Sequence, residues 1–274
     1  MTHSIALALG AGGARGLAHI HAIRAFDELG IKPKIIAGTS MGSIIGAAAC
    51  SGMTADAITD HILGKISNPL SLVNDAFKTR ATSLKRFLAE GGPRIGELNL
   101  ERILDVILPD AVPESFADLT TPLKIAATDF YGARTAVFED GPLRSAMAAS
   151  SAMPAVFLPV KRDGRFHIDG SATNPCPLNI LQGSADHVIA IDVSGGTDGD
   201  PSERPSKLDA MYGANQMMQM SIVQNAAMQY PQTVLLRPPV ASYRALDLLK
   251  AEEILTKTAA LCEKVKYEID RLCA

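Results

Sequence analysis

The chain has 274 residues, of which 47% are hydrophobic and 20% charged, and its formal net charge is −3. This length suits one large α/β domain or two small ones, and it is enough to bury a core without disulfides or structural metals. The composition excludes a disordered chain, and the slightly negative charge gives no general attraction to nucleic acid.

The four cysteines are widely separated along the chain: Cys50, Cys176, Cys262 and Cys273. Because no pair is closely spaced or has zinc-site spacing, we expect the thiols to be small buried side chains in a reducing compartment. The first residues lack the basic flank and small-residue cleavage site of a secretory signal. The most apolar later stretch, 44–50, is too short to span a bilayer. These features predict a soluble, cytoplasmic protein that can still dock on a membrane surface.

The first fifty residues alternate between short apolar runs and helical patterns. A predicted strand over 4–9 ends in a glycine-rich loop, and apolar residues then recur at helical spacing until Gly30, which is expected to cap the helix. A second predicted strand, 34–37, is followed by a sharp turn and a helix of small residues over 43–51. Such alternation predicts a parallel sheet with helices on both faces.

Further strands are predicted over 123–128, 135–138, 165–168, 187–193 and 233–236. Between about 55 and 120 the pattern is mostly helical, with an interruption at Gly91-Gly92-Pro93, which indicates a helical insertion beside the sheet. A polar, turn-rich loop covers 195–205, and an apolar stripe over 254–272 predicts a closing helix. Since no linker is long enough to separate two domains, we expect 1–274 to form a single domain.

Gly38-Thr-Ser-Met-Gly42 has the form G-x-S-x-G and lies between a predicted strand and a predicted helix. In that setting the motif makes a sharp turn that exposes the hydroxyl of its central serine, Ser40, and glycines are needed on either side because a Cβ would clash. The helix that follows directs unpaired N–H groups toward developing negative charge. A glycine-rich turn with a capping serine is the alternative, but the flanking strand and helix favour a nucleophile.

Gly10-Ala-Gly-Gly-Ala-Arg-Gly16 holds four glycines in seven residues. A dinucleotide-binding loop would need a small residue in place of Arg15 and an acid about twenty positions beyond the loop, where 33–38 has none. A phosphate-binding P-loop is excluded because no Gly-Lys-Ser/Thr follows. The small residues leave the backbone N–H groups bare, so the loop can form an oxyanion hole. A tight turn alone would explain one or two of these glycines.

Asp169-Gly170 follows the predicted strand 165–168. An aspartate at the carboxyl end of a strand in an open α/β sheet lies on the edge where ligands bind. Taken alone, Asp-Gly is more often a simple turn.

Together these motifs resemble the patatin-like phospholipases. The opening LGAGGARGLAHI, the GTSMG at residue 38 and the DG at residue 169 have the order and approximate spacing of that family, and ASSAMPAVFLPV at 149–160 resembles the block before its catalytic aspartate. The likeness runs from Ile5 to about Val193 and is strongest to the bacterial branch, which is similar to the catalytic domain of neuropathy target esterase. The resemblance implies a three-layer α/β sandwich with a mostly parallel sheet. It also implies hydrolysis of phospholipids, lysophospholipids or other acyl esters without a metal or cofactor.

Position by position, the resemblance implies that Ser40 is the nucleophile and Asp169 its general base, in a dyad without histidine. It places the oxyanion loop and the motif glycines at Gly12, Gly13, Ala14, Arg15, Gly38, Gly42 and Gly170. Arg15 is expected to orient the loop or to contact an anionic head group. Two positions depart from the family pattern, namely Ala11, where many members have glycine, and Ser171, where glycine or alanine is commoner. Neither departure removes a reacting group.

In the expected mechanism Asp169 accepts the Ser40 proton as the hydroxyl attacks the ester, and the same carboxylate activates the water that hydrolyses the acyl-enzyme. Since a carboxylate is a weaker base than imidazole, the pair needs direct contact and a desolvated aspartate whose pKa is raised. A competing triad would use His187, which alone among the six histidines follows Asp169. His187 opens its strand and should lie far from Ser40. The other candidates, His19, His21 and His167, are expected to be structural.

Two further stretches bear on membranes and on the acyl chain. Residues 62–89 contain five basic side chains and an apolar stripe on the same helical face. Such a helix can lie on an anionic membrane, although a solvated helix packed on the core fits the pattern equally well. Five methionines crowd the stretch 211–228, where core packing is favoured over an acyl pocket.

Three functions are compatible with this sequence: an ester hydrolase, an acyltransferase, and a lipid-binding or regulatory protein that keeps the fold with little turnover. The intact serine, aspartate and glycine loop favour the hydrolase. No pattern in the chain predicts its oligomeric state, its head group or its acyl-chain length.

Overall fold

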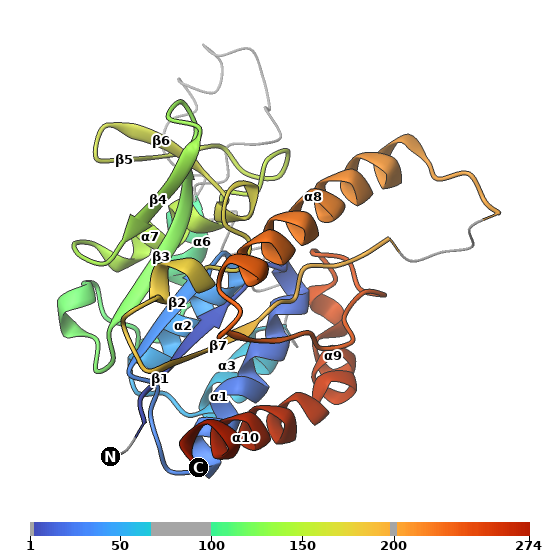
Figure 1. Cartoon of the computed structure of the whole chain (residues 1–274). Helices are drawn as coiled ribbons and strands as arrows, with labels where there is room; N and C mark the ends of the chain where they lie inside the picture. The colour runs from blue at the N-terminus through green and yellow to red at the C-terminus, as the bar shows by residue number, and fades with distance from the viewer. Residues whose placement is uncertain (1–2, 67–99, 198–201) are drawn as a thin grey trace.

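The computed structural model describes residues 3–66, 100–197 and 202–274 (Figure 1). An eight-stranded sheet lies at its centre, in the order β5-β6-β3-β2-β1-β7-β8, and β4 pairs with β3 beside this path. The strands are β1 Ile5–Leu9, β2 Ile35–Thr39, β3 Leu123–Asp129, β4 Arg134–Phe138, β5 Val160–Arg162, β6 Arg165–Ile168, β7 His187–Ile191 and β8 Val234–Leu236.

The middle of the sheet is parallel and one side is antiparallel. β3, β2, β1, β7 and β8 run in the same direction, whereas β4 and β6 pair antiparallel with β3, and β5 pairs antiparallel with β6. The predicted mostly parallel α/β sheet is confirmed. The sequence analysis missed β5, because three residues are too few to carry a recognisable alternation.

Helices and 3₁₀ turns surround the sheet. The helices are α1 His19–Glu28, α2 Met41–Cys50, α3 Ala55–Ile66, α6 Leu100–Ile107, α7 Leu143–Ser151, α8 Lys207–Gln229, α9 Ala251–Thr258 and α10 Ala260–Cys273. The 3₁₀ turns are η1 Gly13–Ala18, η2 Phe116–Asp118, η3 Gly170–Ala172, η4 Leu178–Leu181 and η5 Leu248–Lys250. Gly30 ends α1 with a φ of +66°, a conformation that glycine adopts without strain.

The predicted helical insertion at 55–120 is described only at its two ends, where α3, α6 and η2 lie. Its centre, including the interruption at 91–93, lies outside the described residues. The same is true of the basic stretch 62–89 beyond residue 66, so its membrane contact stays a prediction. Among the helices that the structure describes, none is long and apolar enough to cross a membrane.

The sheet buries a hydrophobic core on each face. Alternate side chains of β1 divide between them: Ile5, Leu7 and Leu9 face a thick layer built from α1, α2, α3, α6, α7, α9 and α10. Ala6 and Ala8 face the opposite side, where a thinner layer is formed by η4 and by Val223 of α8. Small alanines on this second side let the η4 segment approach the sheet closely.

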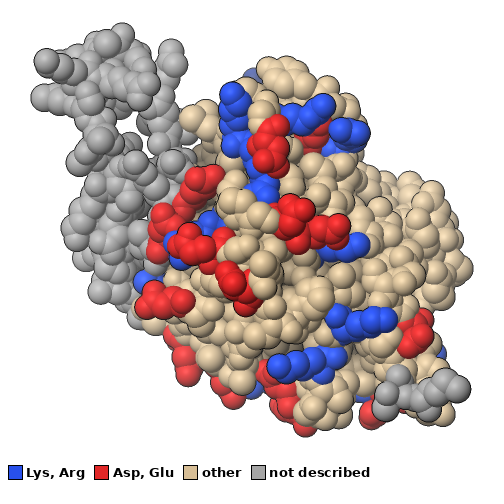
Figure 2. All heavy atoms as spheres, turned by 90° about the vertical axis from the view of Figure 1, so that its left-hand side faces the viewer, with Lys and Arg blue, Asp and Glu red and all other residues tan. Residues whose placement is uncertain are grey.

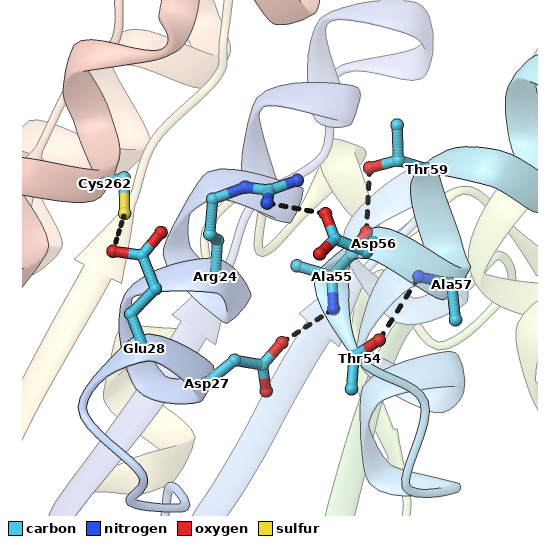
Figure 3. A network of polar contacts seen from close by, with 9 residues as sticks. All are labelled: Arg24, Asp27, Glu28, Thr54, Ala55, Asp56, Ala57, Thr59 and Cys262. Carbon is cyan, nitrogen blue, oxygen red and sulfur yellow. Dashed lines mark hydrogen bonds and ion pairs between the residues drawn. The ribbon is translucent and has the colours of Figure 1, made fainter.

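Polar contacts fasten the helices of the thick layer to one another. Figure 3 shows Arg24 on α1 reaching Asp56 at the start of α3, with 2.6 Å between Nη1 and Oδ1. The neighbouring Asp27 accepts the Ala55 N–H at 2.7 Å and thereby pairs one of the free amides at the start of α3.

The face in Figure 2 carries basic and acidic side chains intermixed. On the β3 side of the sheet, the buried Asp129 pairs with both Arg134 and Arg165, the latter at 2.6 Å. Because the two signs neutralise each other locally, this face presents no field of a single sign.

The methionines of α8 were predicted to pack in the core, but most of them are exposed. Met211, Met217, Met218 and Met228 are each more than half exposed, and Met220 is partly buried. The core interpretation was wrong because α8, orange in Figure 1, packs on the second face of the sheet mainly through its carboxyl-terminal half.

Candidate active site

Ser40 lies in a strained turn between β2 and α2. It has a φ of 55° and a ψ of −124° and stands at the N-cap position of α2. A Cβ at Gly38 would lie 2.6 Å from the Ser43 Cα, and one at Gly42 would lie 2.6 Å from the carbonyl carbon of Leu9. Both positions therefore need glycine, as the G-x-S-x-G interpretation expects, and the turn presents the Ser40 side chain at the carboxyl edge of the parallel strands.

Asp169 lies directly beside this serine. The Ser40 hydroxyl donates to Asp169 Oδ2 at 2.7 Å, and the Ser171 N–H donates to Oδ1 at 2.8 Å. Both residues are buried, at 9% and 4% exposure. Burial raises the pKa of Asp169, and the hydrogen bonds from Ser171 and Ser40 offset part of that rise.

The sequence analysis placed Asp169 at the right edge for a reason that does not apply. β6 runs antiparallel to β3, with Ile168 opposite Thr128, so its carboxyl end points away from the edge where the parallel strands end. The two side chains meet because β6 pairs only with the last two residues of β3 and ends opposite Thr128, two residues from the level of Ala126. That level is also where β2 ends, since Thr39 pairs with Ala126.

Gly170 allows this close approach. A Cβ there would lie 2.7 Å from Thr39 Cγ2 and 2.9 Å from the Ala126 carbonyl carbon, and closer still to the oxygen of that carbonyl. The chain after Asp169 can pass against β2 and β3 only without a side chain at this position. The glycine of the Asp-Gly pair thus sets the depth at which the carboxylate sits.

The loop 10–16 lies against the serine turn. A Cβ at Gly42 would lie 2.8 Å from the Gly10 carbonyl oxygen, and one at Gly16 would lie 2.6 Å from Cγ of Met41. Of the loop's four glycines, Gly13 alone has a positive φ, of 56°. The other three are explained by close packing rather than by a turn.

The amides of the predicted oxyanion loop are not equivalent. The Ala14 N–H donates to the Ala245 carbonyl oxygen at 2.7 Å, and the Arg15 N–H donates to the Gly12 carbonyl oxygen at 3.3 Å. Among the hydrogen bonds of the described residues, none uses the N–H of Gly12 or Gly13. The loop therefore offers two uncommitted amides rather than the four that were expected.

Arg15 braces the loop from within. Its side chain is 3% exposed, and its Nε donates to the Gly12 carbonyl oxygen at 3.2 Å. In the orientation of the Gln216 side-chain amide that fits its hydrogen-bond partners, the Gln216 oxygen accepts from Arg15 Nη1 at 2.9 Å. Burial lowers the pKa of Arg15 to about 10, so the guanidinium stays charged near pH 7. This geometry favours the loop-orienting role over contact with a head group.

The histidines are engaged elsewhere. His19 Nε2–H donates to the Gly10 carbonyl oxygen at 2.7 Å, and burial lowers the pKa of His19 to about 4. His21 Nε2–H donates to the Leu255 carbonyl oxygen at 2.8 Å. His187 opens β7 and pairs with Ile5 at the amino ends of the parallel strands. It lies four residues, or about 13 Å, from the carboxyl end of β7, which is on the edge where Ser40 lies. In the described structure no histidine hydrogen bonds to Ser40 or Asp169, and His167 lies on β6 beside Asp129.

Metal-ligating side chains gather away from this site. In the part of the chain that the structure describes, Glu28, Cys262 and Glu263 form the one group close enough to share an ion. Lys266 already pairs with Glu28 at 2.7 Å and with Glu263 at 2.5 Å, so a cation occupies the space between the carboxylates. Figure 3 shows the Cys262 thiol directed at Glu28 in the same cluster.

One polar residue of the site was missed. Ser150, on α7, accepts the backbone N–H of Ser40 at 2.8 Å. It lies within the segment 149–160 that resembles the family block before the aspartate, but nothing in that pattern says which of its two serines, Ser150 or Ser151, faces the nucleophile.

Comparisons with known proteins identify relatives that cover most of this chain. The sequence model of the family described as patatin-like phospholipase matches residues 7–181. An uncharacterized NTE family protein of Mycobacterium tuberculosis is 34% identical over 192 residues, covering 70% of this chain and 49% of that protein. The neuropathy target esterase sws of Drosophila melanogaster is 29% identical over 204 residues, covering 72% of this chain and 13% of that protein.

Among solved structures, VipD from Legionella pneumophila aligns over 98% of this chain and 67% of its own, with a TM-score of 0.49 and 10% identity. The chain spans about half the length of the mycobacterial relative. The family match extends from β1 through Ser40 to beyond Asp169, which is well over half of the chain. The chain belongs to the patatin-like phospholipase family.

Proposed function

We propose that this chain is a serine acyl-ester hydrolase that cleaves phospholipids, lysophospholipids or related esters through Ser40 and Asp169. The observation that carries the proposal is the 2.7 Å hydrogen bond from Ser40 Oγ to Asp169 Oδ2 in a buried setting. Direct contact and burial are what a carboxylate needs to act as base, since burial raises its pKa toward the working pH. Membership of the family supports a lipid acyl ester as substrate.

In the proposed reaction Asp169 takes the Ser40 proton as Oγ bonds to the ester carbonyl carbon. The tetrahedral intermediate collapses, the C–O bond to the alcohol breaks, and the departing alcohol receives that proton. Water then loses a proton to Asp169 and attacks the acyl-enzyme. Ser40 recovers the proton as the fatty acid leaves, so each proton is returned.

We assign the oxyanion to the uncommitted N–H groups of Gly12 and Gly13. The buried, charged guanidinium of Arg15 fixes the Gly12 carbonyl and adds positive potential behind the loop. Fixed donors of this kind contribute most where water is excluded, and loss of one donor typically costs about 10²- to 10³-fold in kcat. We further propose that 1–274 acts as a single domain, because its two hydrophobic cores lie on opposite faces of one sheet.

The test compares wild type with Ser40→Ala and Asp169→Asn on a short-chain nitrophenyl ester and on phospholipid vesicles, with fatty-acid release measured by mass spectrometry. Asp163→Asn is the matched control, because its carboxylate is 78% exposed on the β5–β6 turn. Both site variants should lose turnover and the control should keep it. Retained turnover in Ser40→Ala would refute the nucleophile.

The same experiment separates the alternatives. A protein that only binds lipid would not react with a fluorophosphonate probe. An acyltransferase would move the acyl chain to an added lysophospholipid in preference to water. We expect labelling of wild type and release of free fatty acid.

A further inference from the structure

Ser150 holds the backbone of Ser40 in place. It is fully buried in the last turn of α7, and its Oγ accepts the Ser40 N–H at 2.8 Å. The same hydroxyl donates its proton to the carbonyl oxygen of Ala126 on β3 at 2.7 Å. Both distances are those of well-formed hydrogen bonds, so one side chain links the serine turn to the central strand.

The same end of α7 also holds Asp169. The Asp169 N–H donates to the Ala152 carbonyl oxygen at 2.9 Å, and Ala152 is the C-cap residue of α7 and fully buried. Ser150 and Ala152 are two residues apart on one piece of backbone. The amides of both dyad residues are therefore tied to a single helix end.

This support matters because the serine turn is strained. A non-glycine residue with positive φ keeps that conformation only if its surroundings enforce it, and Ser40 has a φ of 55°. Its N–H precedes α2 and has no carbonyl of that helix to bind. Without the Ser150 hydroxyl the Ser40 N–H would be buried and unpaired, and a turn that relaxed to reach another acceptor would move Oγ away from Asp169.

We infer that Ser150 is a positioning residue: it fixes the Ser40 backbone so that Oγ stays within hydrogen-bonding distance of Asp169. The inference rests on the proposed function for its catalytic consequence. Both hydrogen bonds of the Ser150 hydroxyl go to backbone atoms, so it acts through Ser40 and not on the substrate.

Ser151 provides a matched control. It is the next residue on the same helix, and its Oγ is buried but has no hydrogen-bond partner in the described part of the chain. Ser150→Ala removes the hydroxyl. Ser150→Cys keeps nearly the same volume but offers a much weaker acceptor, so it tests the hydrogen bond even if the alanine variant folds poorly. Ser151→Ala makes the same chemical change one position away.

The kinetic readout is the second-order rate of fluorophosphonate labelling, together with kcat and KM for a short-chain ester across pH. Ser150→Ala and Ser150→Cys should lower the labelling rate and kcat by about tenfold or more, because small displacements of reacting groups are costly. KM should stay at the wild-type value, since the substrate contacts are not altered, whereas the acid limb should move to higher pH, because a displaced Ser40 hydroxyl no longer lowers the pKa of Asp169. Ser151→Ala should react like wild type. Equal labelling rates in the Ser150 and Ser151 variants would overturn the inference.

A second readout does not depend on activity. Hydrogen exchange of the Ser40 amide, followed by NMR, should be faster in both Ser150 variants than in Ser151→Ala. Unchanged exchange would show that Ser150 does not hold this amide. Ser40→Ala, labelled in parallel, reports on the proposed function separately: if it labels like wild type, the nucleophile is wrong, while amide exchange in the Ser150 variants still tests the support.

Discussion

Substitution of Gly170 by alanine should separate the two members of the proposed dyad. The Cβ of an alanine would lie 2.7 Å from Thr39 Cγ2 and even nearer to the Ala126 carbonyl oxygen. Non-bonded carbon atoms prefer separations of about 3.5–4.0 Å. Thr39 and Ala126 belong to paired central strands, so the chain at 169–171 must move instead, by about 1 Å.

A shift of this size exceeds what the dyad tolerates. The Ser40–Asp169 hydrogen bond measures 2.7 Å and would be stretched beyond the range of an O–H···O bond. A displacement of about 1 Å at a reacting group can cost about 10²-fold in rate. Overpacking in a buried region costs about 1–3 kcal/mol, which for a domain of this size lowers Tm by about 2–5 °C.

The assay combines kcat on a short-chain ester with thermal unfolding followed by circular dichroism. Gly64→Ala is the matched control: no atom of the described residues lies within 4 Å of the position that its Cβ would take, and it stands inside α3, where alanine is favoured by about 1 kcal/mol. The control should keep full activity and melt no lower than wild type. A Gly170→Ala protein with wild-type kcat and Tm would refute the argument that this glycine sets the position of the carboxylate.

Asp169→Asn should abolish activity yet raise Tm at pH 7, because burial raises the pKa of Asp169 and disfavours the ionised form in the folded protein. A group with a raised folded-state pKa stabilises the fold fully below its unfolded pKa, and it loses that contribution as pH rises through the folded-state pKa. The Tm advantage of the variant should therefore vanish near pH 4. A lower Tm than wild type at pH 7 would contradict this sign. Ser171→Ala removes a hydroxyl that lowers the pKa of Asp169, so the acid limb of kcat/KM should move to higher pH, and an unmoved limb would argue against Asp169 as the base. Gly13→Ala should cost more stability than Gly30→Ala in urea unfolding. Both glycines have positive φ, but a Cβ at 13 would lie 2.8 Å from the Ala245 carbonyl carbon, whereas one at 30 meets no atom of the described chain within 4 Å. Equal losses would show that the clash is relieved without cost.

The sequence determined the local features of this protein. The central strands could be predicted from short, continuous apolar runs, because a strand buried on both faces must be apolar throughout, as β1 is. The G-x-S-x-G turn was predictable because only glycines fit at 38 and 42 around a serine with positive φ. Gly30 could be predicted as the end of α1 for a similarly local reason.

Other features depend on contacts between distant segments. The β6 strand was predicted, but its antiparallel direction was not, because the side-chain period of a strand is the same in either direction. The methionines of α8 could not be assigned to the surface, because the composition of a helix does not say which of its sides another element covers.

The candidate site divides in the same way. The candidate residues at 40, 169 and 10–16 could be predicted from the sequence, because a nucleophile, a base and exposed backbone amides each require particular residue types. Which amides are free was decided by the Ala245 carbonyl, some 230 residues from the loop, and which serine supports Ser40 was decided by the orientation of α7. A hydrogen bond between segments far apart in the chain leaves no periodic trace in the sequence, so only the folded structure could assign these partners.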